Sequence, residues 1–198
     1  PSVTYTAAGT YTITHTAANA SGTSTPVSST ITVSANPTVA VTSATVCSGT
    51  AASITASGAT TYSWNTGATT ASISVTPTIT TTYTVTGTNA AGCANTKTTT
   101  VNVNAAPSVT VANATICRGS STNLTASGAT TYSWNTGATT ASISVTPTIT
   151  TNYTVTGTTT GCTNTKTLSV TVNPTPTVAA SNATICNGSA ASLTASGA

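Results

Sequence analysis

One stretch of the sequence occurs twice without a change: residues 55–81 are repeated at 125–151. Landmarks around it recur after 69 or 70 positions, and a third copy begins near residue 176. The landmarks are Cys47, Cys117 and Cys186; Trp64 and Trp134; Cys93 and Cys162; and Pro37, Pro107 and Pro176. A period of about 70 residues is too long for most solenoid units, and it suits a compact domain of about seven short strands.

Bulky residues within each copy alternate with threonine and serine. Tyr62 and Trp64 are two positions apart, as are Tyr83 and Val85, and side chains so spaced lie on one face of a strand. Threonine and valine are β-branched and favour strands. We therefore predict an all-β fold of sandwich domains in a linear array, with strands in the first copy at 38–42, 53–57, 61–66, 71–76, 81–88 and 96–104. The predicted core anchors are aromatic: Tyr62, Trp64, Tyr83, Tyr132, Trp134 and Tyr153.

The composition also allows a disordered, low-complexity chain, because it is rich in threonine, serine, alanine and glycine. The regular alternation argues for folded strands instead. Only Lys97, Arg118 and Lys166 carry a permanent charge, and they are far apart in the sequence. No basic cluster for nucleic acid or an anionic membrane is present, and no apolar run is long enough for membrane insertion.

The sequence contains no aspartate or glutamate and a single histidine, His15. Catalysis by paired carboxylates, calcium sites of the usual type and an acid-supported serine triad are therefore excluded. We expect no catalytic, cofactor-binding or metal-binding residue, and we expect His15 to have a structural role. The prediction is that this chain is not an enzyme.

Two resemblances refine the domain organisation. Residues 9–22, GTYTITHTAANASG, resemble the C-terminal half of a polycystic-kidney-disease-type (PKD) domain, although His15 stands where that family usually has an apolar residue. The longer copies resemble bacterial immunoglobulin-like repeats through VCSG, ICRG and ICNG, the TASGA strand, YSWNTGAT, TTYTVTGT and the GC turn. The expected domains are 1–35 (PKD-like), 36–105 and 106–174 (complete repeats) and 175–198 (the start of a third repeat).

The second resemblance implies a cell-surface location. Such repeats occur in giant secreted and surface proteins of gliding, Bacteroidota-type bacteria, in motility and attachment adhesins exported by the type IX route, and as accessory modules of secreted enzymes. In an extracellular domain, one cysteine pair per copy indicates a disulfide. We predict Cys47–Cys93 and Cys117–Cys162, with the partner of Cys186 beyond residue 198. Pairing between adjacent domains is the alternative.

The expected function is a structural stalk that holds a distal binding region away from the cell. Its expected partners are neighbouring repeats of the same chain, lateral copies of itself, and an unknown surface or glycan ligand at the distal domain. One alternative is a carbohydrate-binding accessory module, which would use exposed aromatic rings. Another is a self-associating extracellular filament. Threonine rows such as residues 80–86 resemble ice-binding surfaces, but they are more typical of a solvated strand face.

Overall fold

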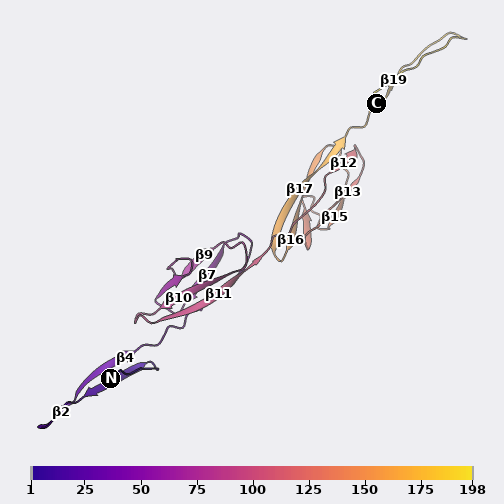
Figure 1. The fold of residues 1–198 in the computed structure, drawn as a ribbon. Helices are drawn as coiled ribbons and strands as arrows, with labels where there is room; N and C mark the ends of the chain where they lie inside the picture. The colour runs from indigo at the N-terminus through magenta and orange to yellow at the C-terminus, as the bar shows by residue number, and fades with distance from the viewer. Residues whose placement is uncertain (1, 198) are drawn as a thin grey trace. The chain divides into compact units, whose positions relative to one another are not determined.

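The computed structural model describes residues 2–197, and all regular secondary structure within them is β-strand (Figure 1). The chain divides into two compact units, Pro1–Asn104 and Ala105–Ala198. Each unit contains one complete copy of the repeat of about 70 residues, and each copy has its own cluster of buried apolar side chains. The all-β prediction is confirmed.

The first copy is a sandwich of two sheets. The smaller sheet has three strands in the order β5 (Ala40–Val41), β7 (Ala52–Ser57) and β9 (Ser72–Val75). The larger sheet has four strands in the order β6 (Ala44–Cys47), β11 (Ala94–Asn104), β10 (Thr81–Thr88) and β8 (Thr61–Trp64).

Strand order identifies the sandwich type. After β6 the chain passes to β7 in the small sheet, β8 in the large sheet, β9 in the small sheet, and then β10 and β11 in the large sheet. This is the alternation of strands B, C, E, F and G in an immunoglobulin sandwich, where B and E share one sheet and C, F and G share the other. The repeats are therefore immunoglobulin-like.

The second copy repeats this arrangement. Its larger sheet has the order β12 (Ala114–Cys117), β17 (Cys162–Asn173), β16 (Thr151–Thr159) and β14 (Thr131–Trp134). Its smaller sheet pairs β13 (Thr122–Thr125) with β15 (Ser142–Val145). An isolated bridge between Thr110 and Ser127 takes the place of the β5–β7 pairing.

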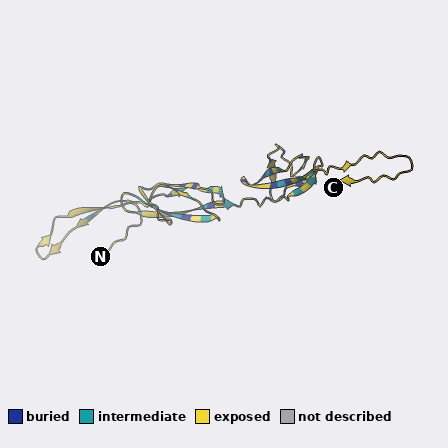
Figure 2. Ribbon diagram, turned by 90° about the horizontal axis from the view of Figure 1, so that it is seen from above, coloured by how far each residue is buried: buried dark blue, intermediate teal, exposed yellow. Residues whose placement is uncertain are grey.

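The core follows the alternation of the sequence (Figure 2). In β10, Tyr83, Val85 and Gly87 are buried, and the threonines between them are partly exposed. Ile54 from the small sheet and Val101 from the large sheet complete the centre, and both are inaccessible to solvent. Burying these apolar side chains from both sheets is what holds the sandwich closed.

The structure contains one strand per copy that the sequence did not predict. β6 pairs in parallel with the end of β11, and its last residue, Cys47, lies opposite Asn104. In the second copy Cys117 lies opposite Asn173 in the same way. β6 contains no aromatic residue, and its partner lies far along the chain, so the alternation of bulky residues that marks β8 does not mark it.

Two further parts of the described chain contain short pairs of antiparallel strands. β1 (Gly9–His15) pairs with β4 (Val27–Val33), and β2 (Ala18–Asn19) pairs with β3 (Gly22–Thr23) at the tip. His15 is exposed at the end of β1. At the other end of the chain, β18 (Ala179–Ala180) pairs with β19 (Ala195–Ser196).

Candidate functional site

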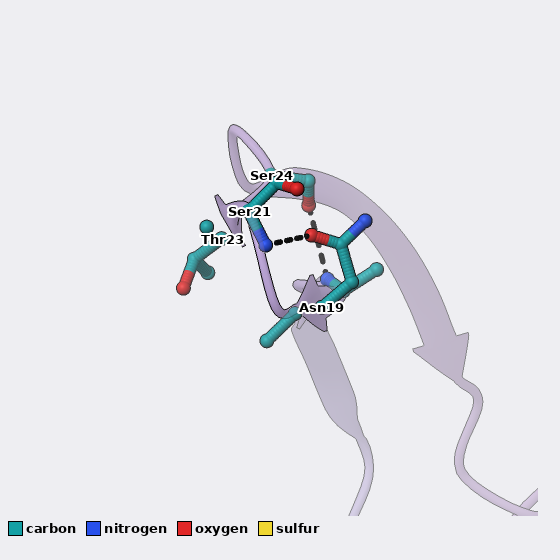
Figure 3. A pocket seen from close by; sticks show the side chains of 7 residues that line it. Asn19, Ser21, Thr23 and Ser24 are labelled. Atoms are coloured by element: carbon teal, nitrogen blue, oxygen red, sulfur yellow. Dashed lines mark hydrogen bonds between the residues drawn. The ribbon is translucent and has the colours of Figure 1, made fainter.

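A hollow lies at the tip of the β1–β4 hairpin (Figure 3). The Ser21 amide donates to Asn19 Oδ1 at 2.9 Å, and the Ala17 amide donates to Ser24 Oγ at 3.0 Å. These side chains complete the hydrogen bonding of the turn itself. The hollow has hydroxyls and one amide but no ionisable group, so its residues can stabilise a turn and cannot perform acid–base chemistry.

Residues 2–197 contain no group of three or more histidine, cysteine, aspartate or glutamate side chains that could bind a metal ion. No helix that could cross a membrane is found among them either.

The tryptophans lie in the two cores. Trp64 and Trp134 are each 3% exposed. Their indole N–H groups donate to the carbonyls of Thr70 and Thr140, both at 2.9 Å. The rings therefore pack between the sheets with their polar atom satisfied, and their faces are not available to stack on a sugar.

The predicted tyrosine anchors fall into two groups. Tyr83 and Tyr153 are buried, whereas Tyr62 and Tyr132 are half-buried. The Tyr62 hydroxyl donates to the Ala59 carbonyl at 3.0 Å and accepts from the Ala59 amide at 3.1 Å. This tyrosine thereby fixes the turn before β8, and Tyr132 does the same at Ala129.

Exposed threonines form paired rows across the large sheets. Hydroxyl pairs face each other between Thr82 and Thr100 at 3.3 Å and between Thr86 and Thr96 at 3.3 Å. The second copy has the corresponding rows on β16 and β17. Each cross-strand hydroxyl pair of this kind contributes about 0.2–1 kcal/mol to the stability of the sheet. They give both repeats a polar face that carries almost no charge.

The predicted Cys47–Cys93 bond is wrong, because the two residues lie at opposite ends of the large sheet. Cys47 is opposite Asn104, the last residue of β11, whereas Cys93 immediately precedes its first residue, Ala94. β11 is 11 residues long. At about 3.3 Å per residue it separates the cysteines by about 30 Å, and a disulfide needs Cα atoms within about 7 Å. Cys93 is a free thiol.

The predicted Cys117–Cys162 bond is wrong for the same reason. Cys162 is the first residue of β17, and Cys117 lies opposite its last residue, Asn173. Cys117 and Cys186 are free thiols, whereas Cys47 and Cys162 are each disulfide-bonded. The sequence prediction paired the two cysteines of each copy without the strands β6 and β12. The parallel pairing of these strands places them at different ends.

The turn that precedes the second cysteine differs between the copies by one residue. In the second copy Thr160 and Gly161 both have positive φ (50° and 81°), as in a two-residue type I′ hairpin, and Cys162 follows directly. In the first copy the turn is longer, and Asn89 Oδ1 accepts from the amides of Ala91 at 3.1 Å and Cys93 at 2.9 Å. Both turns present their cysteine at the end of the repeat where the chain enters.

No protein-family model matches the sequence, and the search of curated proteins gave no match. Among solved structures, an I-band fragment of titin is similar over 86% of this chain and 76% of its own, at 17% identity and a TM-score of 0.43. The N-terminal eight immunoglobulin domains of the Down syndrome cell adhesion molecule give 14% identity and 0.41, over 87% of this chain and 28% of theirs.

A Ca²⁺-stabilised adhesin, described as helping an Antarctic bacterium reach out and bind ice, gives 17% identity and a TM-score of 0.39. The similarity covers 87% of this chain and 59% of that adhesin. At these identities and TM-scores no function is transferred. The assignment of the fold rests on the strand order described above.

Proposed function

We propose that this chain is a structural repeat region, the stalk of a large secreted or surface-anchored bacterial adhesin that presents a distal binding region. The observation that carries the proposal is that one sandwich is built twice with the same core, including the repeated segments 55–81 and 125–151. A spacer needs identical modules, whereas a ligand site usually needs one specialised surface.

Three further features support this role. The tryptophans are buried, so the repeats offer no indole platform for a sugar. The threonine faces are polar and nearly uncharged, which suits a module that contacts only its neighbours in the chain. Disulfide-bonded cysteines are typical of proteins that mature outside the cytosol, which supports an extracellular location. From the resemblance to bacterial immunoglobulin-like repeats, we further propose that the protein belongs to a gliding, Bacteroidota-type bacterium and is exported by the type IX route.

The proposal is tested on the producing bacterium. Antibodies raised against residues 36–174 are expected to label intact cells, and in-frame removal of one repeat is expected to reduce attachment without changing the affinity of the distal region for its ligand. A protein confined to the cytosol would contradict the proposal. So would a loss of affinity that equals the loss of attachment, because the repeat would then be part of the binding site.

The carbohydrate-binding alternative makes a different prediction. A sugar that stacks on Trp64 or Trp134 must change the environment of the indole, so titration with polysaccharides would change the fluorescence. Because both rings are 3% exposed, we expect no change across a broad glycan panel. A saturable change that is lost in Trp64→Phe would instead favour a sugar-binding module.

The stability of the repeats is expected to depend little on pH and salt. Acid denaturation arises mainly when paired or hydrogen-bonded carboxylates are protonated, and this sequence has no aspartate or glutamate. We expect the midpoint of thermal unfolding to change by less than about 2 °C between pH 4 and pH 8, and by as little between low and high salt. Scanning calorimetry under each condition checks this, and a strong shift in either series would contradict it.

A further inference from the structure

We propose that Asn19 is a glycosylation site, at which a sugar is attached through the side-chain nitrogen. Residues 19–21, Asn-Ala-Ser, match the acceptor motif Asn-X-Ser/Thr, in which X is any residue except proline. The first unit, Pro1–Asn104, contains this motif once. Glycosylation at this position is independent of the proposed stalk function.

The motif lies at the tip of the β1–β4 hairpin. Asn19 is the last residue of β2, Ala20 and Ser21 form the turn, and Gly22 begins β3. Every residue from 17 to 24 is exposed. An exposed tip of this kind can enter the active site of a modifying enzyme while the pairing of β1 with β4 stays intact.

A hydrogen bond fixes the orientation of the Asn19 carboxamide. The Ser21 amide donates to Asn19 Oδ1 at 2.9 Å, and because an N–H group needs an acceptor, the atom it meets is the oxygen and not the nitrogen. The side-chain nitrogen points away from the Ser21 amide (Figure 3). Among residues 2–197 no group accepts a hydrogen bond from this nitrogen. The atom that must attack the sugar is therefore free to react.

Three motifs of the second unit are held within its sandwich. The second unit contains five motifs, which begin at Asn113, Asn123, Asn152, Asn182 and Asn187. The first has its carboxamide oxygen bonded to the Ser169 amide at 3.0 Å. The middle residues of the second and third are Leu124 and Tyr153, which are buried in the core. An enzyme could reach these three asparagines in an active-site cleft only after local unfolding of the repeat.

The two remaining motifs are exposed but lack the bond that orients Asn19. In the last motif the Ser189 amide donates to the Cys186 carbonyl at 3.1 Å instead of to the asparagine. Within the described part of the chain, no bond from the third residue of the motif reaches Asn182 either. Asn19 therefore combines an exposed motif with an oriented carboxamide, and we expect it to be the preferred acceptor.

Attachment needs a transferase and a sugar donor whose anomeric carbon is bonded to a nucleotide diphosphate or a lipid diphosphate. The anomeric C–O bond breaks, and its electron pair leaves with the diphosphate. A C–N bond forms to Asn19 Nδ2, and the proton lost from this nitrogen passes to a base of the transferase. Neither an oxidant nor a reductant is required. The chain serves only as the acceptor.

A glycan at this tip gives the hairpin a protection that its side chains do not provide. β1 and β4 form a two-stranded sheet, so each strand has one edge without a partner strand in that sheet. Proteins commonly block such edges with charged side chains, but residues 2–35 contain no lysine, arginine, aspartate or glutamate. A bulky, solvated sugar hinders the approach of another strand edge.

The test uses the protein isolated from the producing bacterium, and the same protein made in a host without asparagine glycosylation serves as the mass reference. After reduction, trypsin cleaves the chain after Lys97, Arg118 and Lys166. Residues 1–97 contain the motif once, at Asn19. We expect the peptide that ends at Lys97 to be heavier than its reference by one or more sugar residues. The peptides that end at Arg118 and Lys166 are expected to match their references.

Matched variants separate attachment at the asparagine from attachment at one of the many hydroxyls. Asn19→Gln and Ser21→Ala are each expected to abolish the added mass, whereas Ser21→Thr keeps the motif and is expected to retain it. Ser21→Ala also keeps the backbone amide that orients the carboxamide, so it tests the motif separately from the turn. The unfolding midpoints of the repeats are expected to be unchanged in all three variants, because residues 17–24 are exposed.

Three results would overturn the proposal. The first is a peptide ending at Lys97 that has the same mass as its reference. The second is added mass that persists in Asn19→Gln, because the sugar would then be attached to a hydroxyl. The third is equal modification of the peptide ending at Lys166, which would show that the motif is selected without regard to its place in the fold.

Discussion

Replacing Trp64 with alanine is expected to unfold the first repeat and leave the second folded. Trp64 is 3% exposed, and it packs between the sheets with Ile54, Val85 and Val101. Truncating a buried tryptophan costs about 3–5 kcal/mol. A domain of this size is stable by about 4–10 kcal/mol, so the loss removes much or all of its stability. The Thr70 carbonyl also loses its indole partner.

The measurement uses the fact that the chain has two tryptophans, one in each repeat. In Trp64→Ala the remaining fluorescence comes from Trp134 and reports the second repeat alone. We expect its unfolding midpoint to be unchanged, while hydrogen exchange in peptides from residues 36–104 becomes fast. Trp134→Ala is the matched control and should reverse the pattern. Exchange that stays slow in the first repeat would contradict the role of Trp64 as the core anchor.

Substituting Gly58 with alanine is expected to destabilise the first repeat far more than the same change at Gly67. Both glycines have positive φ, +89° at Gly58 and +87° at Gly67, so alanine is strained at either position. A Cβ atom at Gly58 would also overlap the carbonyl oxygen of Thr38, whereas one at Gly67 would meet no atom within 4 Å. The close approach of Gly58 lets the segment just before β5, with buried Val39, lie against the core.

The free energy of unfolding of the first repeat is expected to fall by about 1–2 kcal/mol in Gly67→Ala, because of backbone strain. In Gly58→Ala it is expected to fall by about 2–5 kcal/mol, because of strain and steric overlap together. Gly128, which meets the Ser108 carbonyl in the second repeat, should behave as Gly58 does. Denaturant-dependent hydrogen exchange of peptides from each repeat gives the two free energies separately. Equal losses at Gly58 and Gly67 would show that the overlap is relieved by a movement of the chain.

Sequence reasoning succeeded where the signal was local. The strand predicted at 81–88 is β10, because Tyr83, Val85 and the intervening threonines alternate through its whole length. The same alternation indicated the all-β fold and the buried tryptophans. Information of this kind is contained in neighbouring residues, since side chains two apart share a face.

The disulfide partners of the cysteines could not be predicted from such local patterns. The position of Cys47 depends on a four-residue strand whose partner, Val101–Asn104, lies more than 50 residues later. Neither strand length nor composition marks that parallel pairing, so the sequence did not show that the two cysteines of a copy lie at different ends. Spacing of cysteines along the sequence therefore identified a disulfide protein but gave the wrong partners. The direction of one short strand decides which end of the sandwich each thiol occupies.

That direction has a mechanical consequence. β6 and the end of β11 run the same way, and β6 lies near the start of its repeat while β11 ends it. Traction on the two ends of the repeat pulls these strands past each other along their common axis. The hydrogen bonds between Ala44–Cys47 and Val101–Asn104 are then loaded together in shear, and none can open ahead of the others. Because resistance to forced unfolding is set by the unfolding rate, this small patch is expected to govern how long each repeat withstands tension.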